Sequence, residues 1–149
     1  MVSSDTECVN VSAVVGVDAE LDESSVDDVT ESENRIVSQW REIAADERIQ
    51  LRQQINEIDK ILRPLGLQTR LVVLERANSI ALYFICMTLL AVTNLRDLWQ
   101  SEQLRGIVQS LFIFLSGVST VRVKRLTWPV ASYERCLQFF SSVKGKPTI

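Results

Sequence analysis

The chain has 149 residues, a length that predicts one domain and a tail, because domains usually run about 100 to 200 residues. Apolar residues make up 46% and charged residues 23%, which argues against a collagen-like, low-complexity or fully disordered chain. Histidine is absent, so the commonest general base and the commonest metal ligand are both missing.

The net charge of −3 hides a separation of the two signs along the chain. Residues 1–34 contain ten acids and no base, and the remaining residues hold nine acids and all sixteen bases, a charge of +7. Such asymmetry is typical of an interaction tail or of a membrane-facing body. We expect residues 1–34 to be a disordered acidic tail, although residues 9–17 are rich enough in valine to pair transiently as a strand.

A helix is predicted over residues 35–63, with Asn34 as a cap and with Pro64 and Gly66 ending it. Its apolar residues recur at steps of three and four with one four-residue insertion, which indicates a coiled-coil or helix-bundle stripe. The stripe consists of Ile36, Trp40, Ile43, Leu51, Ile55, Ile58 and Leu62. It either packs on the rest of the chain or binds a partner helix, which is another helical protein or a second copy.

Two segments without charged residues decide the predicted fold. Residues 77–95 and 106–121 are each bracketed by arginines and, with snorkelling of those arginines, reach the length that crosses a bilayer. We therefore expect a two-helix transmembrane hairpin over residues 67–121, whose helices pack along small residues. These are Ala77, Ala81, Thr88 and Ala91 in the first segment and Gly106, Ser110, Gly117 and Thr120 in the second.

Residues 122–149 are expected to be a basic amphipathic segment that contacts lipid. The candidate membrane-interface residues are Trp99, Arg122, Lys124, Arg125 and Trp128. The distribution of Lys and Arg places both termini in the cytosol at an endoplasmic reticulum or other intracellular membrane. The alternative is a soluble cytoplasmic helical bundle with the two uncharged segments as its core.

No arrangement of residues indicates catalysis. The chain lacks a phosphate-binding glycine loop, a Gly-x-Ser-x-Gly elbow and a cluster with metal-ligand spacing. Its cysteines, Cys8, Cys86 and Cys136, are far apart in the sequence, and we expect unpaired thiols. We expect no enzyme, no cofactor, no metal site, no small-molecule substrate and no nucleic-acid partner.

The sequence thus predicts an all-α protein with an acidic tail, a coiled-coil helix, a membrane hairpin and a basic C-terminal helix. Its expected function is that of a small integral membrane scaffold, tether or assembly factor that recruits a partner through residues 35–63. The alternative function is that of a soluble all-helical adaptor, a protein-protein interaction module.

Overall fold

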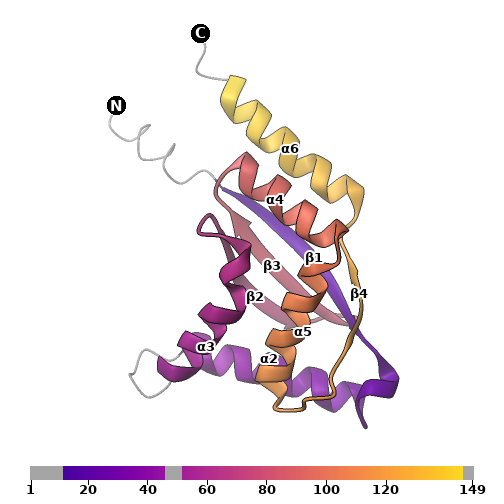
Figure 1. Ribbon diagram of the computed structural model, residues 1–149. Coiled ribbons are helices and arrows are strands. Elements are labelled where there is room, and N and C mark those ends of the chain that lie inside the picture. Colours follow the sequence, from indigo (N-terminus) through magenta and orange to yellow (C-terminus); the bar gives the residue numbers. More distant parts are fainter. Residues whose placement is uncertain (1–11, 46–51, 146–149) are drawn as a thin grey trace.

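The computed structural model describes residues 12–45 and 52–145, with side chains described up to residue 141 (Figure 1). It contains β1 (Ala13–Leu21), α2 (Val29–Ala45), α3 (Arg52–Leu62), β2 (Thr69–Arg76), β3 (Ile80–Cys86), α4 (Leu89–Gln100), α5 (Gln103–Ser116), β4 (Val123–Thr127) and α6 (Val130–Gly145). Two 3-10 turns, η1 (Glu23–Ser25) and η3 (Arg63–Leu65), follow β1 and α3.

The four strands form one sheet in the order β2-β3-β1-β4, and all neighbours are antiparallel. Strand β3 therefore lies between β1 and β2, and β1 lies between β3 and β4. Helices connect β1 to β2 and β3 to β4, and in each case one other strand lies between the two connected strands. This is the split βαβ arrangement of ferredoxin-like folds. Helices α3, α4 and α5 lie in front of the sheet in Figure 1, on one of its two faces.

Strand β1 shows why one face of the sheet is buried. Its burial alternates residue by residue, with Val15 and Val17 fully covered and Val14 60% exposed. Successive side chains of a strand point to opposite faces, so this alternation gives one face to the core and one to solvent. Register with β3 places Val15 opposite Phe84 and Val17 opposite Leu82, which extends the buried surface across the sheet.

Helix α5 is the central helix of the covering layer, in contact with α2, α3, α4 and β4. It buries Leu104, Val108, Leu111, Phe112 and Leu115. The helix ends at Gly117, which has a φ of 73° and donates its N–H to the carbonyl of Ile113 at 2.9 Å. A residue in this left-handed conformation is the common end of an α-helix, and glycine adopts it without strain.

The prediction of an all-α fold is wrong, because the chain contains a four-stranded antiparallel sheet. The same finding overturns the all-helical alternative. The two central strands of the sheet, β1 and β3, lie in segments that were predicted to be a disordered tail and a membrane helix. Strand β1 occupies residues 13–21 of the expected disordered tail, and α2 already begins at Val29. Residues 1–11 of that tail lie outside the described residues.

The transmembrane hairpin is also wrong. Residues 77–95 cover the end of a turn, strand β3 and the first half of α4, and residues 106–121 cover part of α5 and the loop after it. Within 12–45 and 52–145 the structure has no helix of the length and apolarity needed to cross a membrane. These segments lack charge because the inward side chains of β3 and one side of α5 are buried in the core, and the outward side chains of β3 are apolar as well.

The predicted helix over residues 35–63 corresponds to α2 and α3, which run in different directions in Figure 1. Residues 46–51 between them lie outside the described part of the chain. The predicted basic segment after residue 121 is strand β4 followed by α6, which packs against α4 and β1. The helix end at Pro64 and Gly66 is confirmed, since α3 stops at Leu62 and Gly66 has a φ of 91°.

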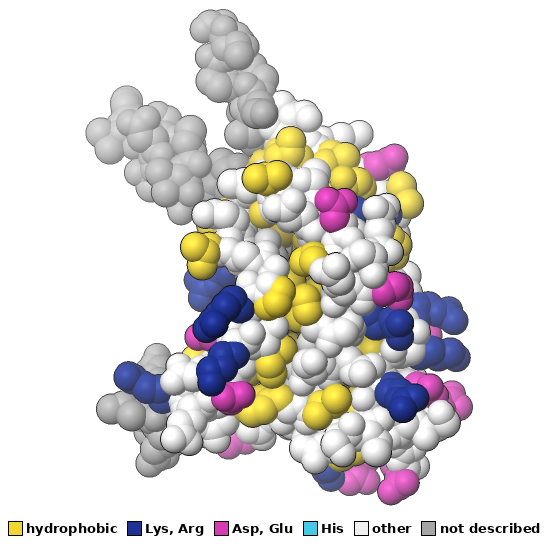
Figure 2. All heavy atoms as spheres, viewed as in Figure 1, with side chains coloured by type: hydrophobic (Ala, Val, Ile, Leu, Met, Phe, Trp, Pro, Cys, Tyr) yellow, Lys and Arg dark blue, Asp and Glu magenta, His cyan; other side chains and the backbone are white. Residues whose placement is uncertain are grey.

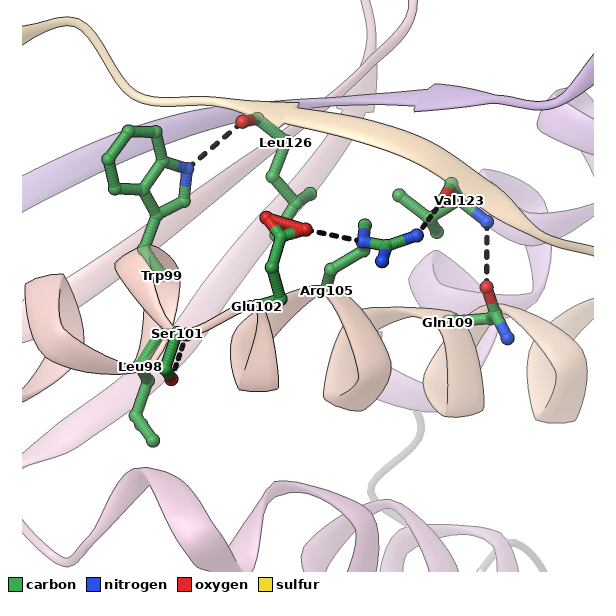
Figure 3. A network of polar contacts seen from close by, with 8 residues as sticks. All are labelled: Leu98, Trp99, Ser101, Glu102, Arg105, Gln109, Val123 and Leu126. Carbon is green, nitrogen blue, oxygen red and sulfur yellow. Dashed lines mark hydrogen bonds and ion pairs between the residues drawn. The ribbon is translucent and has the colours of Figure 1, made fainter.

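Side chains from α4 and α5 hold β4 by its backbone (Figure 3). The indole of Trp99 donates to the carbonyl of Leu126 at 3.0 Å. Gln109 Oε1 accepts from the N–H of Val123 at 3.0 Å, and Arg105 donates to the carbonyl of the same residue at 3.3 Å. These bonds satisfy backbone groups that a strand at the edge of a sheet otherwise exposes.

A buried arginine links α4, β4 and α6. Arg96 is 7% exposed and donates to the carbonyl of Trp128 at 3.0 Å. Its guanidinium lies 4.3 Å from the ring centre of Trp99, 5.0 Å from that of Trp128 and 4.7 Å from that of Tyr133. The faces of three aromatic rings attract the cation and replace part of its hydration.

Replacement of Arg96 by Met should lower the free energy of unfolding by about 1–2 kcal/mol, because the charged hydrogen bond and the cation-π contacts are lost. Arg96→Lys keeps the charge without the planar group and should cost less. Urea unfolding of the three proteins measures the effect. Equal stability of Arg96→Met and wild type would show that the cluster does not hold α6.

An ion pair between α2 and β2 fixes the other side of the sheet. Arg76 Nη2 lies 2.9 Å from Glu33 Oε1, and Glu33 has a side-chain exposure of 6%. Burial raises the pKa of the Glu33 carboxyl above its usual 4.5, although Arg76 acts in the opposite direction. The folded state therefore binds this proton more tightly than the unfolded state does.

The contribution of Glu33 to stability should accordingly decrease as the pH rises through the usual pKa and then through the raised one. Glu33→Gln does not titrate, so the stability of wild type relative to this variant should fall over the same range. Urea unfolding of both proteins at several pH values gives the difference. A difference that increases with pH would contradict the raised pKa.

Candidate functional site

The face of the sheet opposite the helices is open to solvent, and we call it the outer face. Val14, Val72 and Val73 on this face are 60%, 39% and 41% exposed. None of the elements in the described part of the chain covers it, since α2 to α5 pack on the inner face and α6 packs against β1 and α4. Exposed apolar side chains that gather on one surface are typical of a binding site.

The strand register arranges the outer face in rows, because residues directly opposite on antiparallel strands point to the same side. The three rows across β2, β3 and β1 are Arg70, Ile85 and Val14; Val73, Tyr83 and Gly16; and Glu75, Ala81 and Asp18. Strand β4 adds Thr127 beside Asp18, and Arg125 opposite Glu20. The face therefore has an apolar middle, Arg70 at one end, and at the other end Glu75, Asp18 and Glu20, the last of which pairs with Lys124 at 3.9 Å.

Tyr83 lies at the centre of this face, across Gly16 on the neighbouring strand. A Cβ atom at Gly16 would lie 3.2 Å from Cε1 of the tyrosine ring, closer than an ordinary van der Waals contact. The absence of a side chain at Gly16 therefore lets the ring lie close to the sheet. An aromatic side chain covering a glycine of an adjacent strand also strengthens the pairing of the two strands.

A bulge in β2 widens the apolar part of the face. The register of β2 against β3 shifts between Leu71 and Val73, so that Val72 is an extra residue. A β-bulge bends a strand and increases its local twist. In a regular strand one of two consecutive residues points to the core. At this bulge both Val72 and Val73 are about two-fifths exposed.

The predicted partner-binding stripe is largely packed within the chain. Ile36, Ile43 and Ile58 are buried in the core, and Trp40 and Leu62 pack partly against it. Ile55 is 36% exposed. Leu51 lies outside the described residues. Binding of a partner through this stripe stays a prediction, and Ile55 is the position at which it is best tested.

The predicted hairpin-packing residues lie in separate elements and form no common seam. They are Ala77 in the turn before β3, Ala81 in β3, Thr88 as the cap of α4, Ala91 in α4, Gly106 and Ser110 in α5, Gly117 at its end and Thr120 in the following loop. Thr88 Oγ1 accepts from the N–H of Ala91 at 3.0 Å, which explains a polar residue at this position.

The predicted membrane-interface residues divide into two groups. Trp99 and Trp128 come together in an edge-to-face pair around Arg96, with ring centres 6.3 Å apart. Trp128 is 1% exposed and belongs to the core. Arg122, Lys124 and Arg125 are exposed on β4 or just before it. On the helical side, apolar side chains lie among groups of both charges (Figure 2).

The described cysteines are poor nucleophiles. Burial raises the pKa of the Cys86 thiol to about 11, and burial also raises the pKa of Cys136. The thiolate is the reactive form of cysteine, so both side chains stay unreactive near neutral pH. Cys8 lies outside the described residues. Over residues 12–45 and 52–145, no three cysteine or acidic side chains are grouped as metal ligands would be.

A polar cleft of about 590 Å³ lies between the connections β1-α2 and α5-β4. Its lining includes Ser25 and Arg122, and the N–H of Arg122 donates to Ser25 Oγ at 3.1 Å. Next to it, Asp22 accepts bonds from the hydroxyl and the N–H of Ser24, and these bonds lower the pKa of Asp22. The polar groups here bond to one another, and we assign the cleft no ligand.

No protein-family model matches this chain, and neither do the curated proteins or the solved structures with which it was compared. Function is therefore inferred from the geometry alone. The outer face was missed in the sequence because its central contact joins Gly16 to Tyr83, 67 positions apart. The sequence signal that could have indicated it is the alternation in residues 13–21, where every second residue from Ala13 to Leu21 is apolar and Asp18 and Glu20 stand between them.

Substitutions on the two faces of the sheet should differ in their cost. Val17→Ala removes methyl groups from the core and should lower the free energy of unfolding by about 2 kcal/mol. Val73→Ala removes them from the outer face and should cost less than about 1 kcal/mol. Chemical denaturation of both variants gives the comparison. An equal loss would mean that Val73 is buried within the chain.

Proposed function

We propose that this protein is a non-catalytic protein-protein interaction module that binds its partner on the outer face of the sheet. The observation that carries the proposal is the apolar middle of this face, Val14, Val72, Val73, Tyr83 and Ile85, which no described element covers. Apolar side chains on a rigid sheet bind without ordering a flexible segment, which keeps the entropic cost of association low.

The composition of the face favours a protein over a nucleic acid. Tyrosine and branched apolar side chains are typical of the centre of protein interfaces, with charged groups around them. Asp18 and Glu75 stand at one end of the face and would repel the phosphates of a nucleic acid there. The high pKa of Cys86 and the lack of histidine favour binding over catalysis.

The proposal is tested by placing one charge on each candidate surface. Val73→Asp puts a carboxylate in the middle of the outer face, and Ile55→Asp does the same on the exposed position of α3. Both positions are about equally exposed, 41% and 36%, so the variants are matched controls. Urea unfolding first confirms that each variant keeps its fold.

Tagged full-length proteins are then cross-linked in the cells that make them, and the bound proteins are quantified by mass spectrometry. We expect proteins that are recovered with wild type and Ile55→Asp to be lost with Val73→Asp, because a charge in an apolar contact is costly to bury. Loss with Ile55→Asp alone would assign binding to the helical stripe. Equal recovery with all three proteins would reject the outer face as the docking surface.

A further inference from the structure

We infer that the partner on the outer face is a second copy of this chain, bound through the same face about a two-fold axis. This inference rests on the proposed function and adds the identity of the partner. A dimer of this kind needs a surface that is complementary to itself, because each patch meets its own copy. The outer face meets this condition in the charges of β2 and in its apolar middle row.

The axis of such a dimer would lie along the middle row, Val73, Tyr83 and Gly16, perpendicular to the strands. Rotation about it reverses the direction of each strand and keeps the strand order. The first row of one copy then faces the third row of the other, and the middle row faces itself. Packing of the two sheets with nearly aligned strands is a common arrangement, with the sheets about 10 Å apart.

The charges match in this arrangement. Arg70 and Glu75 both point outward from β2, in rows equally far from the middle row. Each Arg70 therefore faces Glu75 of the other copy, which gives two identical ion pairs. In the described part of the chain neither residue forms an ion pair within its own copy. The bulge at Val72 matters here, because without it Arg70 and Glu75 would point to opposite faces.

The apolar centre of the face also meets itself. Ile85 in the first row faces Ala81 in the third row, and Ala81 is only 4% exposed, so Ile85 meets a flat part of the sheet. Tyr83 lies on the axis and meets its copy, and each ring lies over Gly16 of its own chain. One pair does not match, since Val14 faces Asp18, but this pair stands on the side toward β4, next to Thr127.

The contact is small, so the dimer should be reversible. The three rows, about 6.7 Å apart, cross the three strands β2, β3 and β1, about 4.8 Å apart, and cover roughly 300 Å² of sheet. Stable interfaces usually bury about 800 Å² on each partner. We expect monomer and dimer to exchange over the micromolar range of concentration, with an affinity set largely by the paired charges and by Tyr83.

Sedimentation velocity of the purified full-length chain over a range of concentrations tests the inference. Wild type should shift from monomer to dimer. Arg70→Glu and Glu75→Arg should each weaken association at least 10-fold, because they place like charges opposite one another. The double variant Arg70→Glu/Glu75→Arg should restore association, which a misfolded protein would not do. Arg63→Glu, an exposed charge reversal away from the face, is the control and should dimerise as wild type does.

Two results would overturn the inference. A dimer that survives Tyr83→Asp would have its contact elsewhere, such as the edge of β2, because two carboxylates on the axis must repel each other. A wild type that stays monomeric at all concentrations would exclude a second copy as the partner. The outer face as a docking surface is tested separately, by whether Val73→Asp loses the proteins that wild type binds.

Discussion

Backbone pairing of β1 between β3 and β4 is the constraint on which the rest of the structure depends. Residues 13–19 pair with β3, and residues 18–21 pair with β4, so a segment near the start of the chain lies inside the sheet. This pairing fixes the side to which each residue of β1 points. Val15 and Val17 join the core, and Val14 and Asp18 are left on the outer face. A shift of the register by one residue would exchange the two sets.

The outer face exists because the described helices cover only the other face. The inner face is closed by α2 to α5, and α6 is held beside β1 by the contacts of Arg96 with Trp128 and Tyr133. The backbone of β4 is occupied by Trp99, Arg105 and Gln109, so this edge has little left for another strand. A partner therefore meets the sheet on its outer face or at the other edge, β2, and Tyr83 over Gly16 marks the centre of the outer face.

Sequence patterns predicted the helices better than the strands. The stop at Pro64 and Gly66 was identified because proline and glycine act locally. Strand β3 was taken for a membrane helix because its outward residues, Ala81, Tyr83 and Ile85, are uncharged like its inward ones, and a short apolar run does not distinguish a strand from a helix. Strand β1 does alternate, but its outward residues include Asp18 and Glu20, which resemble the acids of a tail. The outer face needs contacts between distant residues, which periodicity does not report.

Amide hydrogen exchange of the full-length protein, followed by NMR, tests the central position of β1 most directly. The account predicts that amides of β1 bonded to β3 exchange as slowly as those of β3, at the rate of global unfolding, because a strand inside a sheet opens only with the whole domain. Rapid exchange throughout residues 13–21, as in an unstructured chain, would contradict the fold and with it the outer face.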